Sequence, residues 1–461
     1  MNTYDIIIIG AGPGGYETAI EAAKSGQTVC IVEKAQLGGT CLNVGCIPTK
    51  CLCRSAELLH EARSAAEFGI QTAQVDFDLP AAIQRKDKVV ESLVSGIETL
   101  MRTPGITLLR GEARLADTHS RPYTVEVNTP SEKVSIQASN IIIATGSVSN
   151  FLPIEGAHAP GVVTSTELLS ATTLPPRLCI IGGGVIGMEF ASIYNSFGSK
   201  VTVIEYFKEI LPFFDRDMAK RLRTSLKKRG ITFKTGAAVT KIEDTGATKT
   251  VHYTEGNTNG SEEADLVLMA VGRAANLGSL NLDEAGIHYT KRGITVAPDM
   301  QTNIPGIYAI GDINGMMQLA HAATFQGKVA LSHILAQTPE ATLQPSLHNI
   351  HLDICPAVVF TMPELAMVGR TEEQVKEEGI DYAVKKISYR ANGKALAMGE
   401  GEGTMKILTD QNDHILGAHI LGAHAADLIH EITLLMTLGA TTTDLKRTIH
   451  AHPTLSELFI N

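Results

Sequence analysis

The 461-residue chain contains no run of eighteen or more apolar residues, which is roughly the length that a membrane-spanning helix needs. We therefore expect no contact with a membrane. Its first residues lack the charged and apolar regions of a signal peptide and the Arg- and Ser-rich composition of a transit peptide. The seven cysteines are odd in number and irregularly spaced, unlike a secreted disulfide scaffold. These absences favour a cytoplasmic protein, in which a disulfide is more often catalytic than structural.

Charge and composition narrow the class of protein further. The formal net charge of −10 argues against binding to nucleic acid. Apolar residues make up 44% of the chain, charged residues make up 19%, and there are 42 glycines, which is typical of a folded α/β protein. A chain of this length is too long for a single core, so we expect several domains.

One supersecondary unit occurs twice along the chain. Its first copy runs from an apolar strand and glycine turn at residues 5–15, through an Ala-rich helix, to a second strand at 28–33. Its second copy has the same parts at residues 178–187 and 200–205, and in both copies the second strand ends in a glutamate. Phosphates bind the amides at such a helix N-terminus, and the acid can accept a hydrogen bond from a ribose hydroxyl. Two complete copies predict two Rossmann-like nucleotide-binding domains.

The rest of the chain contains related strands and then a change of pattern. Buried-looking strands close on glycine turns at residues 140–147 and 265–273, and a further strand ends in an acid at 306–312. From about residue 347 strands and helices alternate without glycine fingerprints, which predicts a third domain of α+β type.

Two cysteines lie close to the first glycine turn, at Cys41 and Cys46. In a regular helix a spacing of five would separate them by about 7.5 Å along the axis and roughly 140° around it. Gly45 allows the backbone to distort, and Pro48 suits the first turn of a following helix. Cys46 would then lie at a helix N-terminus, which favours a thiolate, and Lys50 could add positive charge. The pattern favours a disulfide that is oxidised and reduced in turn over a structural one.

The remaining cysteines and the paired histidines have simpler interpretations. Cys51 and Cys53, two apart on a helix, point in roughly opposite directions, so we expect structural thiols. We expect the other three cysteines to be inert, namely Cys30, Cys179 and Cys355. His419 and His424 are five apart and share a face of neither a helix nor a strand. No cysteine or acid cluster accompanies His450 and His452, so we expect no metal site and take His450 to be a structural neighbour.

Together these sequence motifs resemble those of the flavin-dependent pyridine nucleotide–disulfide oxidoreductases. The resemblance covers essentially the whole chain, and the motifs occur in the family's order. The resemblance implies an FAD-binding domain at residues 1–150 and 271–346 and an NAD-binding domain at 151–270. It implies an interface domain at residues 347–461 that forms a homodimer. The residues implied to hold FAD and NAD are Gly10, Gly12, Gly14, Gly15, Glu33, Lys34, Gly39, Thr40, Lys50, Gly111, Thr145, Gly146, Ser147, Asp312, Gln318, Leu319, Ala320, His321, Gly182, Gly184, Val185, Ile186, Gly187, Glu189, Glu205, Val239 and Gly272.

The resemblance also implies catalytic roles. Cys41 is the thiol that exchanges with substrate, and Cys46 faces the flavin and passes electrons to it. His452 is the acid and base, oriented by Glu457, and both reach into the partner subunit's active site.

Lys50 is implied to contact the flavin ring and to form an ion pair with Glu189. The implied reaction oxidises dihydrolipoamide, carried on the lipoyl domain of a 2-oxo-acid dehydrogenase complex or of the glycine-cleavage system, with NAD⁺ as acceptor.

Single residues separate the members of the family. Glu205 favours NAD over NADP, because it binds the free ribose hydroxyl and repels a phosphate, and residues 206–211 contain no arginine. The last cysteine is Cys355, which counts against members with an additional C-terminal redox pair. Two other hypotheses stay open: a reductase for another disulfide or a metal ion, and a flavoprotein subunit that contributes structure rather than chemistry.

Overall fold

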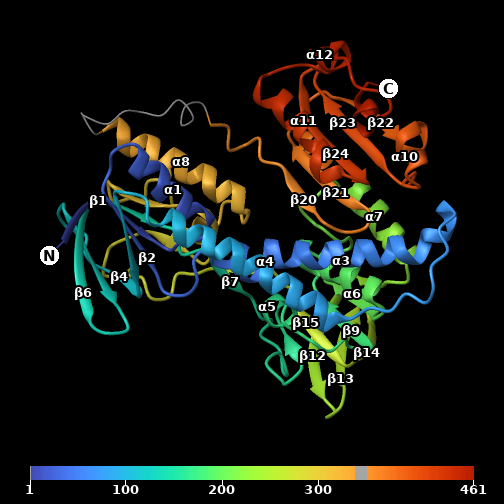
Figure 1. Cartoon of the computed structure of the whole chain (residues 1–461), viewed down its shortest axis with the longest axis horizontal. Coiled ribbons are helices and arrows are strands. Elements are labelled where there is room, and N and C mark those ends of the chain that lie inside the picture. The colour runs from blue at the N-terminus through green and yellow to red at the C-terminus, as the bar shows by residue number, and fades with distance from the viewer. Residues whose placement is uncertain (1, 338–349, 461) are drawn as a thin grey trace. The chain divides into compact units, whose positions relative to one another are not determined.

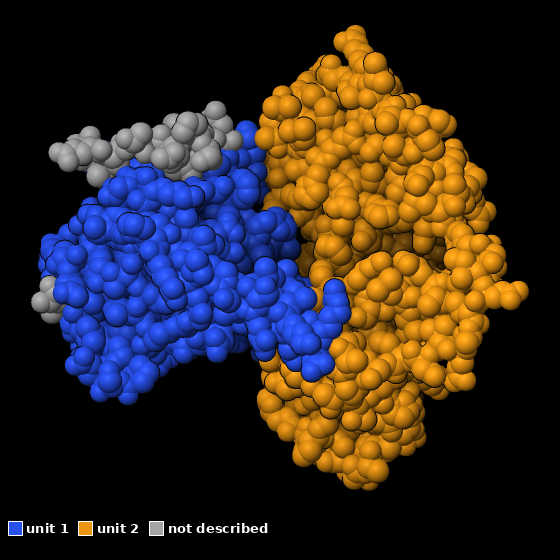
Figure 2. All heavy atoms as spheres, viewed as in Figure 1, with its two compact units in different colours: residues 1–49, 84–150, 273–352 blue, residues 50–83, 151–272, 353–461 orange. Residues whose placement is uncertain are grey.

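The computed structural model describes residues 2–337 and 350–460. The chain divides into two compact units, which Figure 2 colours separately. Unit 1 comprises residues 1–49, 84–150 and 273–352, and unit 2 comprises residues 50–83, 151–272 and 353–461. The predicted boundary at residues 346 and 347 lies outside the described residues, and the division into three domains stays a prediction.

Unit 1 is built on a mixed seven-stranded sheet (Figure 1). Its strands are β1 (Asn2–Ile9), β2 (Val29–Glu33), β3 (Ile106–Arg110), β4 (Glu112–Asp117), β5 (Tyr123–Asn128), β6 (Lys133–Ile143) and β19 (Ile307–Ala309). The order is β3-β2-β1-β6-β5-β4, and β19 pairs with β6. The strands β3, β2, β1, β6 and β19 are parallel, whereas β4 and β5 are antiparallel. The isoleucine run of β1 is buried because helices and strands cover both faces, as in other parallel sheets.

Helices and short strands complete unit 1. The helices are α1 (Pro13–Lys24), α2 (Gly39–Val44) and α8 (Ala320–Ala336), and the short strands are β7 (Ser147–Ser149), β16 (Arg273–Ala275), β17 (Tyr289–Thr290) and β18 (Gly293–Ile294). Small residues let α1 lie close to the sheet, where Ala19 and Ala22 join one apolar core with Ile6 and Ile8. The division between the units falls within two further helices, α3 (Cys46–Ser64) and α4 (Leu79–Leu100).

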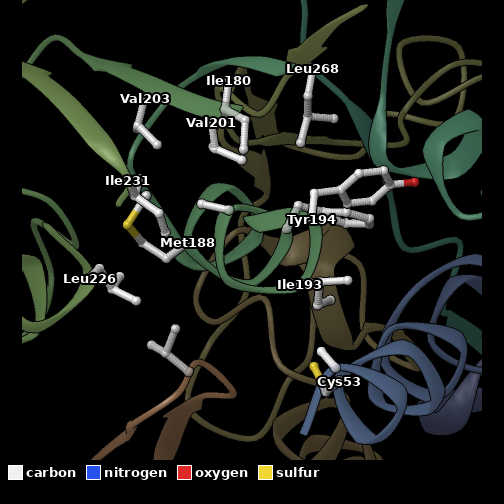
Figure 3. Close-up of a cluster of buried hydrophobic side chains, with 14 of the residues drawn as sticks. Cys53, Ile180, Met188, Ile193, Tyr194, Val201, Val203, Leu226, Ile231 and Leu268 are labelled. Atoms are coloured by element: carbon white, nitrogen blue, oxygen red, sulfur yellow. The ribbon is translucent and has the colours of Figure 1, made fainter. Parts of the chain in front are cut away.

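Unit 2 contains a five-stranded parallel sheet in the order β11-β10-β9-β15-β8. Its strands are β8 (Val162–Val163), β9 (Arg177–Ile181), β10 (Lys200–Glu205), β11 (Thr232–Thr235) and β15 (Leu266–Met269). The helices beside it are α5 (Ser165–Leu168), α6 (Val185–Phe197) and α7 (Arg216–Lys228), and a separate antiparallel sheet consists of β12 (Ala237–Asp244), β13 (Lys249–Glu255) and β14 (Thr258–Ala264). Figure 3 shows the core between this parallel sheet and α6, with Ile180 and Val201 above Met188 and with Cys53 below Ile193.

The parallel strands of unit 1 and the parallel sheet of unit 2 repeat the same local geometry. At the end of the first strand, Gly10 donates its N–H to Val32 O in unit 1 (2.8 Å), and Gly182 donates to Ile204 O in unit 2 (2.9 Å). The strands on the other side, β6 in unit 1 and β15 in unit 2, are bonded to the first strand in the same way. Ala144 donates its N–H to Ile9 O and Ala270 donates its N–H to Ile181 O, both at 2.8 Å. The two strand–turn–helix repeats that predict nucleotide binding therefore fold the same way.

The last part of unit 2 is an α+β arrangement on an antiparallel sheet of order β20-β21-β24-β23-β22. The strands are β20 (Ala357–Val359), β21 (Glu364–Gly369), β22 (Ala383–Ser388), β23 (Thr404–Thr409) and β24 (Ile415–Gly422). The helices are α9 (Glu372–Glu377), α10 (Gly393–Ala397), α11 (Ala425–Thr437) and α12 (Thr442–Arg447). The predicted fold class, two Rossmann-like parts and a C-terminal α+β part, is confirmed. In the described part of the chain no helix has the length and apolar character to span a membrane.

Candidate active site

The first glycine turn joins β1 to α1 in unit 1. Gly10 has a φ of 106°, and a Cβ on it would collide with the carbonyl of Ala144, so only glycine fits there. Gly12 is the N-cap of α1, and within the described residues no side chain hydrogen-bonds to that end. A Cβ on Gly12 would meet only the Cα of Gly39, at 4.0 Å. Gly12, at the N-terminus of α1, therefore borders open space, which suits the diphosphate of a dinucleotide.

Glu33, at the end of β2, lies beside this turn and is buried. Its Oε2 accepts the N–H of Ala11 and its Oε1 accepts the N–H of Ala35, both at 2.7 Å. A carboxylate has about four lone-pair positions, so two remain for ribose hydroxyls. Gly111 lies next to Glu33, because its N–H donates to the backbone oxygen of Glu33 (3.0 Å). The Lys34 side chain forms an exposed ion pair with Glu112.

The second glycine turn, between β9 and α6 in unit 2, repeats the first. Glu205 accepts the N–H of Gly183 through Oε2 and the N–H of Phe207 through Oε1 (2.6 Å). A Cβ on Gly187 would collide with the carbonyl of Gly182. Gly184 is the N-cap of α6, and a Cβ on it would meet nothing within 4 Å among the residues described. The residues at the two turns thus fit the two dinucleotides that the sequence predicts, FAD and NAD.

The cysteine pair lies just after the first turn. Cys41 belongs to α2 and Cys46 begins α3, because Gly45 breaks the helix with φ and ψ of −141° and −112°. A Cβ on Gly45 would come within 2.8 Å of Thr40 O, so a larger residue could not make this break without a shift. Cys46 is exposed and stands at the N-terminus of a 19-residue helix, where the dipole favours a thiolate.

A residue that the sequence analysis missed, Arg273, lies in the same unit. Its Nε donates to Ser147 Oγ (2.8 Å) and its Nη2 to Ser147 O (2.7 Å), and Ser147 in turn donates to Asp312. Burial lowers the pKa of Arg273, while the charges of Asp312 and Cys46 oppose that change. The guanidinium thus supplies positive charge to Cys46 and ties β16 to the predicted flavin residues. Its position directly after a glycine that follows a buried strand was the signal that could have found it.

The other predicted flavin residues of unit 1 lie near the start of α8. Leu319 is the N-cap of this helix, Ala320 and His321 are its first residues, and Gln318 donates Nε2 to Arg273 O (3.1 Å). A Cβ on Gly14 would approach Ala323 O at 3.1 Å, which places the first turn of α8 against the first glycine turn. The start of α8 thus belongs to the same site.

Lys50 and Glu189 form an ion pair within unit 2. Lys50 Nζ lies 2.9 Å and 3.0 Å from the two oxygens of the buried Glu189 carboxylate. The backbone N–H of Phe360 also donates to Glu189 (3.0 Å), and Lys50 Nζ lies 4.2 Å from the centroid of the Phe360 ring. The pair is therefore held by α3, α6 and the turn that follows β20.

His452 and Glu457 also meet, near the C-terminus. His452 Nδ1 lies 2.9 Å from Glu457 Oε1, and the N–H of Thr454 donates to Glu457 Oε2 (2.9 Å). The Thr454 amide and His452 hold the pKa of Glu457 below its usual range. Because the carboxylate accepts the proton of Nδ1, Nε2 keeps a lone pair, and this exposed nitrogen is suited to act as a base.

The predicted residues are divided between the two units. Unit 1 contains Gly10, Gly12, Gly14, Gly15, Glu33, Lys34, Gly39, Thr40, Cys41, Cys46, Gly111, Thr145, Gly146, Ser147, Asp312, Gln318, Leu319, Ala320 and His321. Unit 2 contains Lys50, Gly182, Gly184, Val185, Ile186, Gly187, Glu189, Glu205, Val239, Gly272, His452 and Glu457. In the described ranges no group of three His, Cys, Asp or Glu side chains could hold a metal ion.

The thiols interpreted as inert or structural are mostly buried. Cys30, Cys51, Cys53 and Cys179 are buried, and Cys355 is half-buried. Burial raises the pKa of Cys30 to about 12 and that of Cys355 to about 11. A thiol whose pKa is raised in this way is a poor nucleophile at neutral pH.

Comparison with known families agrees with this geometry. The family described as pyridine nucleotide-disulphide oxidoreductase matches residues 4–327, and the dimerisation domain of that family matches residues 355–461. The first match spans more than half of the chain, so the chain belongs to the pyridine nucleotide-disulphide oxidoreductase family. The resemblance seen in the motifs is confirmed, and FAD and NAD are the cofactors that this family uses.

Individual relatives cover almost the whole chain. It is 41% identical over 461 residues to a protein of Chlamydia muridarum named dihydrolipoyl dehydrogenase, covering 99% of this chain and 95% of the relative. Among solved structures, LpdA from Mycobacterium tuberculosis has a TM-score of 0.90 at 27% identity, covering 100% of this chain and 98% of the other. A copper(II) complex of the HOCl-induced flavoprotein disulfide reductase RclA from Escherichia coli has a TM-score of 0.86 at 32% identity, with the same coverage.

Proposed function

We propose that the chain oxidises protein-bound dihydrolipoamide to lipoamide, with NAD⁺ as acceptor, through FAD and a redox-active disulfide of Cys41 and Cys46. The observation that carries the proposal is the helix break at Gly45, which sets two cysteines at the junction of α2 and α3 beside a nucleotide-binding turn. The name of the Chlamydia muridarum relative supports the choice of substrate.

The thiol exchange uses residues of this chain. His452 Nε2 takes the proton of a substrate thiol, whose sulfur attacks Cys41, so that the Cys41–Cys46 bond breaks and Cys46 leaves as a thiolate. The N-terminus of α3 and Arg273 stabilise that thiolate. The second substrate thiol then attacks the mixed disulfide, which releases lipoamide and leaves the protein reduced by two electrons. When bound, FAD supplies the chemistry that carries these two electrons from the dithiol to NAD⁺ as a hydride.

Each dinucleotide has its own turn in this proposal. FAD binds residues 1–150 and 271–346 at the turn beside Glu33, and NAD binds residues 151–270 at the turn beside Glu205. Lys50, which forms an ion pair with Glu189, contacts the flavin ring in this proposal. Glu205 and the absence of arginine from residues 206–211 favour NAD over NADP, because a carboxylate repels a 2′-phosphate.

The active assembly in this proposal is a homodimer in the cytoplasm. The C-terminal region, residues 347–461, forms the interface, and the match of residues 355–461 to a dimerisation domain supports this arrangement. His452 and Glu457 of one copy then serve the cysteine pair of the other. The substrate is carried by the lipoyl domain of a 2-oxo-acid dehydrogenase complex or of the glycine-cleavage system.

The test is NADH-dependent reduction of lipoamide by the purified holoenzyme. Cys46→Ser is expected to retain bound FAD, seen by its absorbance, and to lose the lipoamide reaction, whereas the half-buried control Cys355→Ser retains both. Glutathione disulfide, Hg²⁺ and Cu²⁺ are assayed in parallel with lipoamide. A higher kcat/KM for any of these three, or a Cys46→Ser variant as active as the parent, would overturn the proposal.

A further inference from the structure

A second histidine–glutamate pair lies next to the proposed base. His450 Nε2 lies 2.7 Å from Oε1 of Glu431 on α11, and His450 Nδ1 lies 2.9 Å from the carbonyl oxygen of Thr448. The side chain of His450 is 4% exposed, whereas that of His452 is 80% exposed. Two similar pairs thus stand in contrasting surroundings, two residues apart.

The hydrogen-bond partners of His450 determine which of its ring nitrogens carry a proton. A backbone carbonyl oxygen can only accept a hydrogen bond, and an ionised carboxylate oxygen can only accept as well. Both contacts are satisfied together only when each ring nitrogen carries a proton, which makes the ring an imidazolium facing Glu431. Such a ring has no lone pair to take a proton from a thiol, so His450 is not a second base.

The contact between His450 and Glu431 also fixes the segment that carries His452. His450 is held to α11 two residues before His452, and Thr454 is held two residues after it, because Asn392 Nδ2 donates to Thr454 O (3.0 Å). Thr454 Oγ1 closes the segment on itself by donating to Ala451 O (2.7 Å). The base is therefore carried by a short segment that is anchored on both sides, and Glu431 supplies the anchor on the N-terminal side.

We propose that Glu431 and the imidazolium of His450 are a positioning pair that holds His452 where it can reach the substrate thiol. The inference rests on the proposed role of His452 and adds two residues that do not touch the reacting atoms. A group that takes a proton must lie within hydrogen-bond reach of it, and a displacement of about 1 Å can cost roughly a hundredfold in rate.

The test compares variants of Glu431 in two reactions of the holoenzyme. Glu431→Ala is expected to lower kcat for NADH-dependent lipoamide reduction by roughly tenfold to a hundredfold. It should leave unchanged the oxidation of NADH by ferricyanide, which needs no thiol base. Glu431→Gln is expected to restore most of the lipoamide reaction, because its amide can donate to a neutral His450 Nε2. Asp427→Ala removes an exposed acid from the same helix and is the matched control.

The protons of His450 are measured separately, by ¹⁵N NMR of protein labelled in its histidine rings, with His450→Asn used to assign the signal. Two protonated ring nitrogens at neutral pH support the inference, and one unprotonated nitrogen overturns it. A Glu431→Ala variant with normal lipoamide activity, or with both reactions reduced equally, would also overturn it. If the parent protein does not reduce lipoamide, the proposed function fails, while the NMR result still decides the state of His450.

Discussion

At the scale of single residues, unit 2 contains a group of charged side chains that is largely buried. Lys406 and Asp215 have no exposed surface, and Lys406 Nζ lies 2.6 Å from Asp215 and 2.7 Å from Glu372. His419 is buried beside them, where its Nε2 donates to Arg370 O (3.1 Å), and burial lowers the pKa of His419 to about 4. The group links the N-cap of α7 to β23, β24 and the start of α9, and His419 stays neutral within it.

The lowered pKa of His419 makes the stability of the protein depend on pH. In the unfolded chain this imidazole binds its proton near its ordinary pKa of about 6.5, whereas in the folded protein it does so only near 4. Between these values the unfolded state binds more protons, so stability falls as the pH falls, by up to roughly 1.4 kcal/mol per pH unit. The free energy of unfolding is therefore not reduced by His419 above pH 6.5, and the reduction is complete by about pH 4.

The measurement is the free energy of unfolding in urea at several pH values between 7 and 4. His419→Gln is expected to show a shallower loss of stability over this range than the parent. The sequence Ile-Leu-Gly-Ala-His occurs twice in succession, ending at His419 and at His424. His424→Asn is the matched control, because His424 is exposed and asparagine tolerates the backbone φ of 57° at this position. Identical slopes for the parent and His419→Gln would contradict this account of the buried imidazole.

At the scale of elements, the strand–turn–helix unit explains why glycines recur at fixed places. Gly182 and Gly187 are required by the close approach of backbone to backbone, whereas Gly184 faces open space. The same division holds in unit 1, where Gly10 and Gly15 are confined and Gly12 is open. Confined glycines therefore serve the fold, and open glycines leave room for a dinucleotide.

This division predicts opposite results for two Gly→Ala substitutions in one turn. Gly187→Ala is expected to destabilise the protein by about 1–3 kcal/mol, because its Cβ meets the carbonyl of Gly182. Gly184→Ala should change the free energy of unfolding little but raise the KM for NADH roughly tenfold, since its Cβ occupies the space left for the diphosphate. Urea unfolding and steady-state kinetics measure the two effects. A Gly184→Ala variant with unchanged KM would show that NAD does not bind at this turn.

At the scale of the whole molecule, the C-terminal part exposes apolar side chains on and after α11. Leu434, Leu438 and Ile449 are 59%, 71% and 97% exposed. A second copy of the chain would cover such residues in the proposed homodimer, and burial of each would contribute about 1.5–3 kcal/mol to association.

Disrupting this surface should separate two activities. Leu438→Glu is expected to give a monomer of 49.2 kDa by light scattering, with lipoamide reduction lost because His452 no longer reaches the cysteine pair of a partner. NADH oxidation by ferricyanide should remain. Leu93→Glu, an exposed leucine of α4, is the control and should stay dimeric. A Leu438→Glu monomer with full lipoamide activity would contradict the shared site.

The sequence by itself determined the features that depend on residues close together along the chain. The two nucleotide-binding units could be predicted because strand, turn and acid lie within about 30 residues, and a turn with φ near 106° at Gly10 accepts little but glycine. The break between α2 and α3 follows from Gly45 in the same way, since the restriction on the backbone is local.

Only the tertiary structure decided the contacts between distant residues. Lys406 and Asp215 are 191 positions apart, and Arg273 and Ser147 are 126 apart, so no local pattern marks either pair. Lys34, which the resemblance placed at the cofactor, has its side chain paired with Glu112. His450 and His452 lie two residues apart in the sequence, but the fold buries the ring of His450 beside Glu431 and leaves the ring of His452 exposed beside Glu457. Burial and hydrogen-bond partners are properties of the packed chain, and these set the protonation of a side chain.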